Sequence, residues 1–253
     1  MQGLNLDLAN PRNHSTWRVF DFEPGAEAEW QLVLAAIESP DIAPERAGNC
    51  SEFDFRRIVD IVASIALIVA LAPLLLLLAV MVIVTDPGPP VFSHHRVGKN
   101  GKMFRCLKFR SMCVNAEARL DRMFVEDPLL KAEWERSHKL CRDPRVTRIG
   151  HLLRVSSLDE LPQLFNVLSG SMTLVGPRPI VMREISQYGR FFSYYLSVKP
   201  GLTGLWQVTG RSSVSYQRRV AADILYVRTR SLGLDFRILL ATVPAVLLGW
   251  GAC

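Results

Sequence analysis

The pattern of hydrophobic and polar positions separates one long apolar run from several short amphipathic stretches. Residues 61–84 carry no charged side chain, and Ser64 is the one polar side chain among these 24 residues. About 20 apolar residues suffice to cross a bilayer as a helix. Uncharged runs of this length are rare in soluble domains, so the pattern predicts a membrane helix.

The flanks and the middle of this helix bear on its topology. Pro73 lies near the middle, where it removes a backbone hydrogen bond and bends a helix. Both flanks are basic, and lysine- and arginine-rich flanks favour the cytoplasm. The basic residues are Arg56 and Arg57 before the run, and Arg96, Lys99, Lys102, Arg105, Lys108 and Arg110 after it. We therefore expect a re-entrant membrane helix over residues 51–90, kinked at Pro73, although a kinked spanning helix also fits the pattern.

The segment before the membrane run is mostly polar. Within it, residues 26–39 show apolar positions at helical spacing, and Pro40 ends that pattern. The first 25 residues contain no apolar run, so no signal peptide is expected. We expect residues 1–50 to form a partly disordered N-terminal extension.

After the membrane run, residues 91–253 are expected to form one cytoplasmic catalytic domain. Two short extended runs, about 91–97 and 102–110, flank an Asn-Gly pair, which indicates a β-hairpin. Helical patterns follow at 114–140, 180–197 and 215–230, with a glycine-punctuated loop over 199–211. The predicted fold class is α+β and mostly helical.

The sequence predicts two further helices. The first carries a leucine stripe and runs to about Ser169, and Gly170 closes it. The apolar run from Ile238 is too short to span a bilayer and suits an amphipathic helix at the membrane interface.

Composition and charge narrow the class of protein. With 49% hydrophobic and 21% charged residues, the chain is neither a disordered protein nor a multi-span transporter. The net charge of +6 suits nucleic acid, anionic lipid or a phosphorylated substrate without choosing among them. Five scattered cysteines without a CxxC pair argue against a disulfide framework or a zinc site.

The adjacent carboxylates Asp159 and Glu160 have two interpretations. Ser157 and Glu160 have the spacing of a helix capping box, which needs no function. Alternatively, Arg154 and Arg178 nearby would bind phosphate, while the carboxylates hold Mg²⁺ or one of them attacks phosphorus. The residues alone leave both interpretations open.

Several long motifs resemble one known family. They are "KFRSM" at 108–112, "SLDELPQLFNVLSGSMTLVGPRP" at 157–179, "KPGLTGLWQV" at 199–208 and Asp223 in "DILYV". In their order they resemble the bacterial sugar transferases, small monotopic polyprenyl-phosphate phosphoglycosyl transferases of the exopolysaccharide-initiating type. The resemblance runs from about Arg56 to the C-terminus. One departure is Ala72-Pro73, where the family often has Ser-Pro.

The resemblance implies a mechanism. Asp159 would attack the β-phosphorus of a UDP-sugar, UMP would leave, and undecaprenyl phosphate would then take the phosphosugar. Glu160 would help Asp159 and Asp223 to hold Mg²⁺. The same resemblance assigns substrate binding as follows: phosphate to Arg154, Lys108 and Arg110, and the nucleotide side to Pro177, Arg178 and Pro179.

The resemblance also implies the cytoplasmic face of the inner membrane and favours UDP-galactose or UDP-glucose as donor. Two other functions stay open: a membrane-bound, Mg²⁺-dependent nucleotide-sugar hydrolase, and a non-catalytic membrane scaffold. No nucleic-acid partner is expected, because no recognised binding motif appears. A homo-oligomer is left open.

Overall fold

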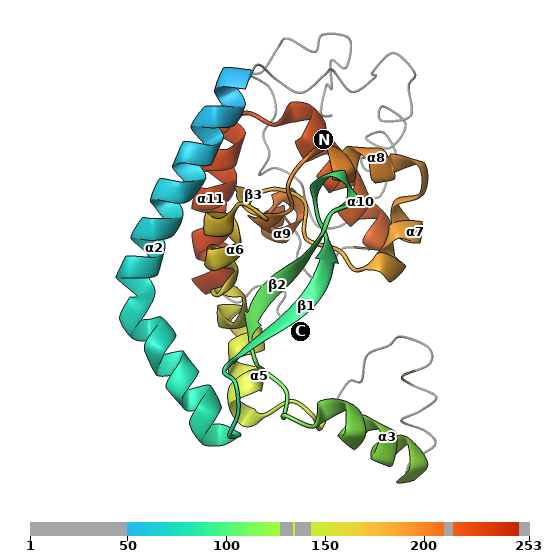
Figure 1. Cartoon of the computed structure of the whole chain (residues 1–253). Helices are drawn as coiled ribbons and strands as arrows, with labels where there is room; N and C mark the ends of the chain where they lie inside the picture. Colours follow the sequence, from blue (N-terminus) through green and yellow to red (C-terminus); the bar gives the residue numbers. More distant parts are fainter. Residues whose placement is uncertain (1–49, 127–133, 135–142, 210–214, 248–253) are drawn as a thin grey trace, which may run out of the picture.

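The computed structural model of the chain describes residues 50–126, 134, 143–209 and 215–247. The helix predicted within residues 26–39 lies outside this part. Helix α2 (Cys50–Thr85) is one continuous helix that contains Pro73, and Figure 1 shows it bent near its middle. Its segment Phe55–Thr85 is long and apolar enough to cross a membrane, by length and composition, and only 11% of its most apolar window is buried.

Both ends of α2 are attached to the rest of the described chain. Near the start, Arg57 donates to the carbonyl oxygens of Val167 (2.6 Å) and Leu168 (2.7 Å). One turn later, the buried Asp60 accepts from the backbone N–H of Leu174 at 3.0 Å. Beyond the bend, the helix packs on strand β2 and helix α5 through the cluster of Leu78, Val82, Phe109 and Leu153.

The predicted β-hairpin is confirmed. Strand β1 (Val91–Val97) pairs antiparallel with β2 (Met103–Phe109), and the short turn Lys99–Gly101 joins them. Asn100 (φ 57°) and Gly101 (φ 75°) take the left-handed conformation that this turn needs. Asparagine and glycine adopt that conformation most readily, which explains the Asn-Gly signal.

A second, parallel strand pair was not predicted. Strands β3 (Thr173–Val175) and β4 (Gly201–Thr203) are three residues each; β4 lies in the segment predicted as a glycine-punctuated loop, and β3 in a segment for which no element was predicted. They come very close: a Cβ on Gly201 would lie 2.1 Å from the backbone nitrogen of Gly176. The glycines that indicated a loop therefore permit this close pairing.

Short helices make up most of the remaining described chain. In chain order they are α3 (Ala116–Glu126), α5 (Arg148–Val155), the 3₁₀ turn η2 (Leu158–Glu160), α6 (Gln163–Ser169), the 3₁₀ turn η3 (Met182–Glu184), α7 (Ile185–Tyr188), the 3₁₀ turn η4 (Gly189–Phe191), α8 (Phe192–Ser197), α9 (Leu205–Thr209), α10 (Tyr216–Thr229) and α11 (Leu232–Leu247). The mostly helical α+β class is confirmed.

Helix ends confirm some predictions and correct one. Helix α6 ends at Ser169, and Gly170 caps it at φ 85°. Helix α10 falls within the predicted 215–230. The single helix predicted over 180–197 is wrong: Gly189 (φ 48°, ψ −128°) breaks it into α7 and α8. Of the helix predicted over 114–140, residues 127–133 and 135–142 lie outside the described part.

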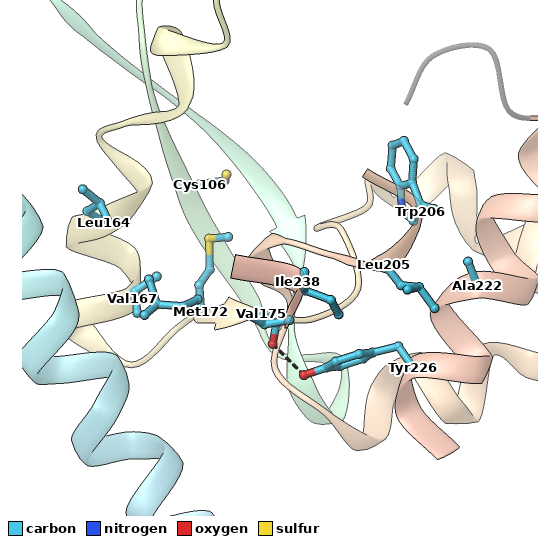
Figure 2. Packing of buried hydrophobic residues seen from close by; sticks show 11 residues of the cluster. Cys106, Leu164, Val167, Met172, Val175, Leu205, Trp206, Ala222, Tyr226 and Ile238 are labelled. Carbon is cyan, nitrogen blue, oxygen red and sulfur yellow. Dashed lines mark hydrogen bonds between the residues drawn. The ribbon is translucent and has the colours of Figure 1, made fainter. Parts of the chain in front are cut away.

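The main core cluster joins α6, the parallel strands and the C-terminal helices. Figure 2 shows Leu164, Val167 and Met172 on one side and Tyr226 on the other, with Ile238 between them. The Tyr226 hydroxyl donates to the Val175 carbonyl oxygen at 2.9 Å. Helix α11 leaves Phe236, Leu240 and Val243 exposed. An interfacial role for this helix stays a prediction.

Candidate active site

The two adjacent carboxylates lie in the turn η2 between α5 and α6. Ser157 enters this turn in the left-handed conformation (φ 58°), and its side chain makes no cap hydrogen bond. Helix α6 begins only at Gln163. The capping-box interpretation of Ser157 and Glu160 is therefore wrong, because the turn points the Glu160 side chain at a different partner.

That partner is Lys108 of β2. Its Nζ lies 2.7 Å from Glu160 Oε1 and 3.4 Å from Asp159 Oδ2. A guanidinium nitrogen of Arg178 lies 3.8 Å from the same Glu160 oxygen. One ammonium group thus bridges both carboxylates, and a second cation stands beside Glu160.

A buried amide fixes the hairpin against α6. Asn166 Oδ1 accepts from the backbone N–H of Leu107 at 2.9 Å, and its Nδ2 donates to the Arg105 carbonyl oxygen at 2.8 Å. Asn166 is 6% exposed, so these bonds are shielded from water. They hold Lys108, the residue after Leu107, in a fixed register with η2.

The surroundings separate the pKa values of the two carboxyl groups. Burial raises the pKa of Asp159, Lys108 lowers it, and the charge of Glu160 raises it again, so that the net direction is upward. Burial also raises the pKa of Glu160, but Lys108 and Arg178 outweigh it and lower the value to about 2. Two neighbouring carboxyl groups with separated pKa values are typical of sites that give each a different role.

Arg154 and Arg110 have hydrogen-bond partners outside the carboxylate pair, and their phosphate-binding roles stay predictions. Arg154 Nε donates to Ser111 Oγ at 2.9 Å. The charge of Arg154 also lowers the pKa of Asp159, but less than Lys108 does. Arg110 is paired with Asp86, at the end of α2: it donates to the Asp86 carbonyl oxygen and lies 3.7 Å from its carboxylate. Lys108 lies in β2 and Arg110 just after its end, and of these two side chains Lys108 is the one that contacts the carboxylate pair.

The Pro177-Arg178-Pro179 loop forms one wall of the site. Pro177 is fully buried, and its carbonyl oxygen accepts from Gly201 N–H at 2.8 Å. The Pro179 carbonyl oxygen accepts from Arg96 at 3.3 Å. The two prolines thus anchor the loop, and Arg178 between them reaches Glu160.

Asp223 of α10 has another partner. Its Oδ2 accepts from the Tyr188 hydroxyl at 2.6 Å, and burial raises its pKa to about 7. Within the described residues, no three His, Cys, Asp or Glu side chains form a group that could hold a metal ion. The structure therefore does not bring Asp223 together with Asp159 and Glu160.

The carboxylate pair offers oxygen donors of the kind that Mg²⁺ takes. This ion is bound by one or two carboxylates together with substrate phosphates. The Lys108 ammonium already shows that Asp159 and Glu160 converge on one cation. These two residues therefore fit Mg²⁺, with substrate oxygens completing its coordination.

A small hollow beside Glu160 contains residues that the motif analysis missed. Lys108, Arg178 and Pro179 line it together with five further residues: Arg96, Cys106, Gln163, Leu202 and Gln207. The Gln207 Oε1 atom is buried and has no hydrogen-bond partner in the described part of the chain. Gln207 stands inside the quoted "KPGLTGLWQV" motif, so the sequence did carry a signal for it.

Comparisons with known proteins show which sequences this chain is similar to. A family described as "Bacterial sugar transferase" matches residues 51–249. The chain is 49% identical to the UDP-galactose-lipid carrier transferase of Erwinia amylovora, covering 81% of this chain and 43% of the relative. It is also 49% identical to the undecaprenyl-phosphate galactose phosphotransferase of Salmonella typhimurium, covering 78% of this chain and 41% of the relative.

A shorter relative matches along almost its whole length. The exopolysaccharide production protein ExoY of Rhizobium meliloti is 43% identical, and the match covers 86% of this chain and 97% of the relative. The chain thus spans about two fifths of the first two relatives and nearly all of the third.

Proposed function

The chain belongs to the bacterial sugar transferase family, and from this premise we propose that it transfers a sugar 1-phosphate from a UDP-sugar to undecaprenyl phosphate. The observation that carries the proposal is the carboxylate pair Asp159–Glu160, converging on Lys108 with Arg178 beside it. The product would begin the assembly of an exopolysaccharide or another glycan.

In the proposed first step, a carboxylate oxygen of Asp159 attacks the β-phosphorus of the UDP-sugar. A bond forms between Asp159 and phosphorus, the bond from phosphorus to the bridging oxygen breaks, and UMP leaves with that electron pair. In the second step, a phosphate oxygen of undecaprenyl phosphate attacks the same phosphorus. The Asp159 carboxylate is released, and a polyprenyl-diphosphate sugar forms.

The electrostatics of the pair support this division of roles. A carboxylate with a raised pKa, such as Asp159, is the more basic and more nucleophilic of two. Glu160, with a pKa of about 2, stays ionised at neutral pH and is suited to hold a cation. When Mg²⁺ is bound by these carboxylates, it offsets the repulsion between an anionic nucleophile and a diphosphate.

The attachment of α2 supports a re-entrant membrane helix. Its first turns bind α6 and β3, and its last turns pack on β2 and α5. Because both ends contact the same body, that body and both helix ends lie on one side of the membrane in our proposal. The basic flanks of the helix favour the cytoplasm for this side.

The names of two relatives favour galactose as the sugar. Two of the relatives with 49% identity, those of Erwinia amylovora and Salmonella typhimurium, are named for galactose transfer. We therefore place UDP-galactose ahead of UDP-glucose as the donor.

Intact-protein mass spectrometry tests the proposal. Purified full-length protein is incubated with Mg²⁺ and single UDP-sugars, without lipid, and the released nucleotide is identified. We expect a hexose-phosphate mass on the wild type, release of UMP, and neither with Asp159→Asn. Asp121→Asn, an exposed change in α3, is the matched control and should behave as the wild type.

The same experiment separates the other functions. Release of UMP and free sugar phosphate without an adduct or lipid dependence would indicate the hydrolase. No adduct and no nucleotide release with any donor, and no lipid-linked product when undecaprenyl phosphate is added, would indicate a scaffold.

A further inference from the structure

Two arginine side chains lie over the ring of Trp206 in α9. The guanidinium carbon of Arg219 lies 4.7 Å from the centre of the Trp206 ring, and that of Arg178 lies 5.7 Å from it. Figure 2 shows the Trp206 ring at the edge of the core cluster, directed away from Tyr226. The three side chains come from three segments: the Pro-Arg-Pro loop, α9 and α10.

Holding two guanidinium groups over one ring has an electrostatic cost. Burial lowers the pKa of Arg219, and the charge of Arg178 lowers it further. Such mutual destabilisation of two cations is relieved when an anion binds between or beside them. The pair therefore has the electrostatic character of an anion-binding site.

Acidic groups lie near both guanidinium groups: the charges of Glu184 and Asp223 raise the pKa of Arg219, against the effects of burial and of Arg178. Glu160 lies 3.8 Å from Arg178 but is also bound by Lys108. Asp223 follows Arg219 by four residues on α10, hence on the same face of the helix. However, Asp223 is hydrogen-bonded to Tyr188, and its pKa of about 7 leaves it only partly ionised at neutral pH.

An unsatisfied donor lies in the same cluster. The Trp206 Nε1 atom is buried and has no hydrogen-bond partner among the residues that the structure describes, and the residue is 4% exposed. Buried polar groups without partners are uncommon in folded proteins, and such groups call for an explanation, for which a functional role is one choice. An indole N–H can only donate, so it suits a ligand oxygen.

We propose that Arg219, Trp206 and Arg178 form a subsite for phosphate oxygens, which holds the diphosphate of the nucleotide-sugar donor next to Asp159. This inference rests on the proposed function. It assigns Arg219, which no motif indicated, to donor binding. Phosphate oxygens also occur on the lipid acceptor, and we favour the donor because Arg178 links the cluster to Glu160.

Ligand binding to the full-length protein tests the subsite. The binding of UDP and of uridine is measured with Mg²⁺ for the wild type, Arg219→Gln and Arg219→Lys. We expect Arg219→Gln to weaken UDP binding about tenfold, because charge-assisted hydrogen bonds are lost. Uridine, which has no phosphate, should bind within about twofold of the wild type. Arg219→Lys keeps the charge and should recover part of the loss.

Arg218→Gln is the matched control. It removes the same charge from the neighbouring position of α10 and should leave UDP binding unchanged. Kinetics give a second readout: Arg219→Gln should raise the KM for the UDP-sugar and leave the KM for undecaprenyl phosphate unchanged.

Three results would overturn the subsite. They are unchanged UDP binding in Arg219→Gln, an equal loss of UDP and uridine binding, and a rise confined to the KM of the lipid acceptor. The adduct experiment keeps the two proposals apart. If the wild type forms the adduct and Arg219→Gln binds UDP normally, the subsite fails alone; if the wild type forms no adduct, the proposed function fails.

Discussion

At the scale of single residues, Lys108 determines the state of the carboxylate pair. Its ammonium group contacts both Asp159 and Glu160, and it lowers the pKa of each. It also occupies a cationic position that a Mg²⁺ ion bound by the same carboxylates would compete for. Lys108 therefore affects both the protonation of the two carboxyl groups and their affinity for another cation.

Replacing Lys108 by glutamine should move the acid limb of the pH–rate profile to higher pH. The pKa values of both carboxyl groups rise when the ammonium is removed, so ionised carboxylates persist only at higher pH. The rate of adduct formation measured from pH 4 to 8 tests this. Lys102→Gln, an exposed change, should leave the profile in place, and an unshifted Lys108→Gln profile would contradict the assigned role.

Asp223 should make stability depend on pH in a direction that can be tested. Its pKa rises from 3.8 to about 7 on folding, so the folded state binds the proton more tightly than the unfolded state. Its contribution to stability is thus present below about pH 4 and is lost as the pH rises through about 7. Between pH 5 and 8, the Tm of the wild type should fall more steeply than that of Asp223→Asn. Parallel curves would argue against a buried, protonated carboxyl group.

At the scale of elements, the site depends on how the hairpin β1–β2 and helix α6 are joined. The Asn166 side chain in α6 hydrogen-bonds to two backbone groups of β2. It thereby couples the strand that contains Lys108 to the helix that follows Asp159 and Glu160. The parallel pair β3–β4 holds the Pro177-Arg178-Pro179 loop in place, because this loop follows the end of β3 and Pro177 accepts a hydrogen bond from Gly201 of β4.

Asn166→Ala should lower the free energy of unfolding by about 1–3 kcal/mol. The substitution leaves the Leu107 N–H and the Arg105 carbonyl without their buried partner, and unsatisfied buried groups cost about this much. Adduct formation should slow as well, because Lys108 loses its fixed position. Unfolding of Asn166→Ala is compared with that of Asn115→Ala, an exposed control; equal stability of the two variants would refute the coupling.

At the scale of the whole molecule, the membrane helix and the candidate site form one unit. Helix α2 runs along one side of the molecule in Figure 1, beside α6 and α11. Asp60 and Arg57 near its start contact β3 and α6, and Asp86 just past its end accepts from the backbone N–H of Val114. In the proposed topology, a site attached in this way lies next to the membrane surface, where the phosphate of the proposed lipid acceptor would reach it.

Cysteine labelling tests this topology. Phe55→Cys and Val114→Cys place exposed cysteines near the two ends of α2, each in a background without other cysteines. For a re-entrant helix, a membrane-impermeant maleimide should label both positions from the cytoplasmic side and neither from outside. Labelling of the two positions from opposite sides would show a spanning helix instead.

Local patterns in the sequence determined several features of this protein. The length of the apolar run predicted α2, the Asn-Gly pair predicted the β1–β2 turn, and Gly170 predicted the end of α6. Each depends on residues close together in the chain: a run long enough for a bilayer, or a residue that tolerates positive φ. The motifs likewise pointed to Asp159, Glu160 and Arg178, which do lie together.

The partners of the charged side chains were decided only by the tertiary structure. Ser157 and Glu160 have the spacing of a capping box, yet Glu160 pairs with Lys108, 52 positions away in the chain. Arg110 pairs with Asp86, Asp223 with Tyr188, and Arg219 lies over Trp206. Sequence spacing cannot fix such pairs, because burial removes water from each charge, and the nearest available partner is then set by how distant segments pack.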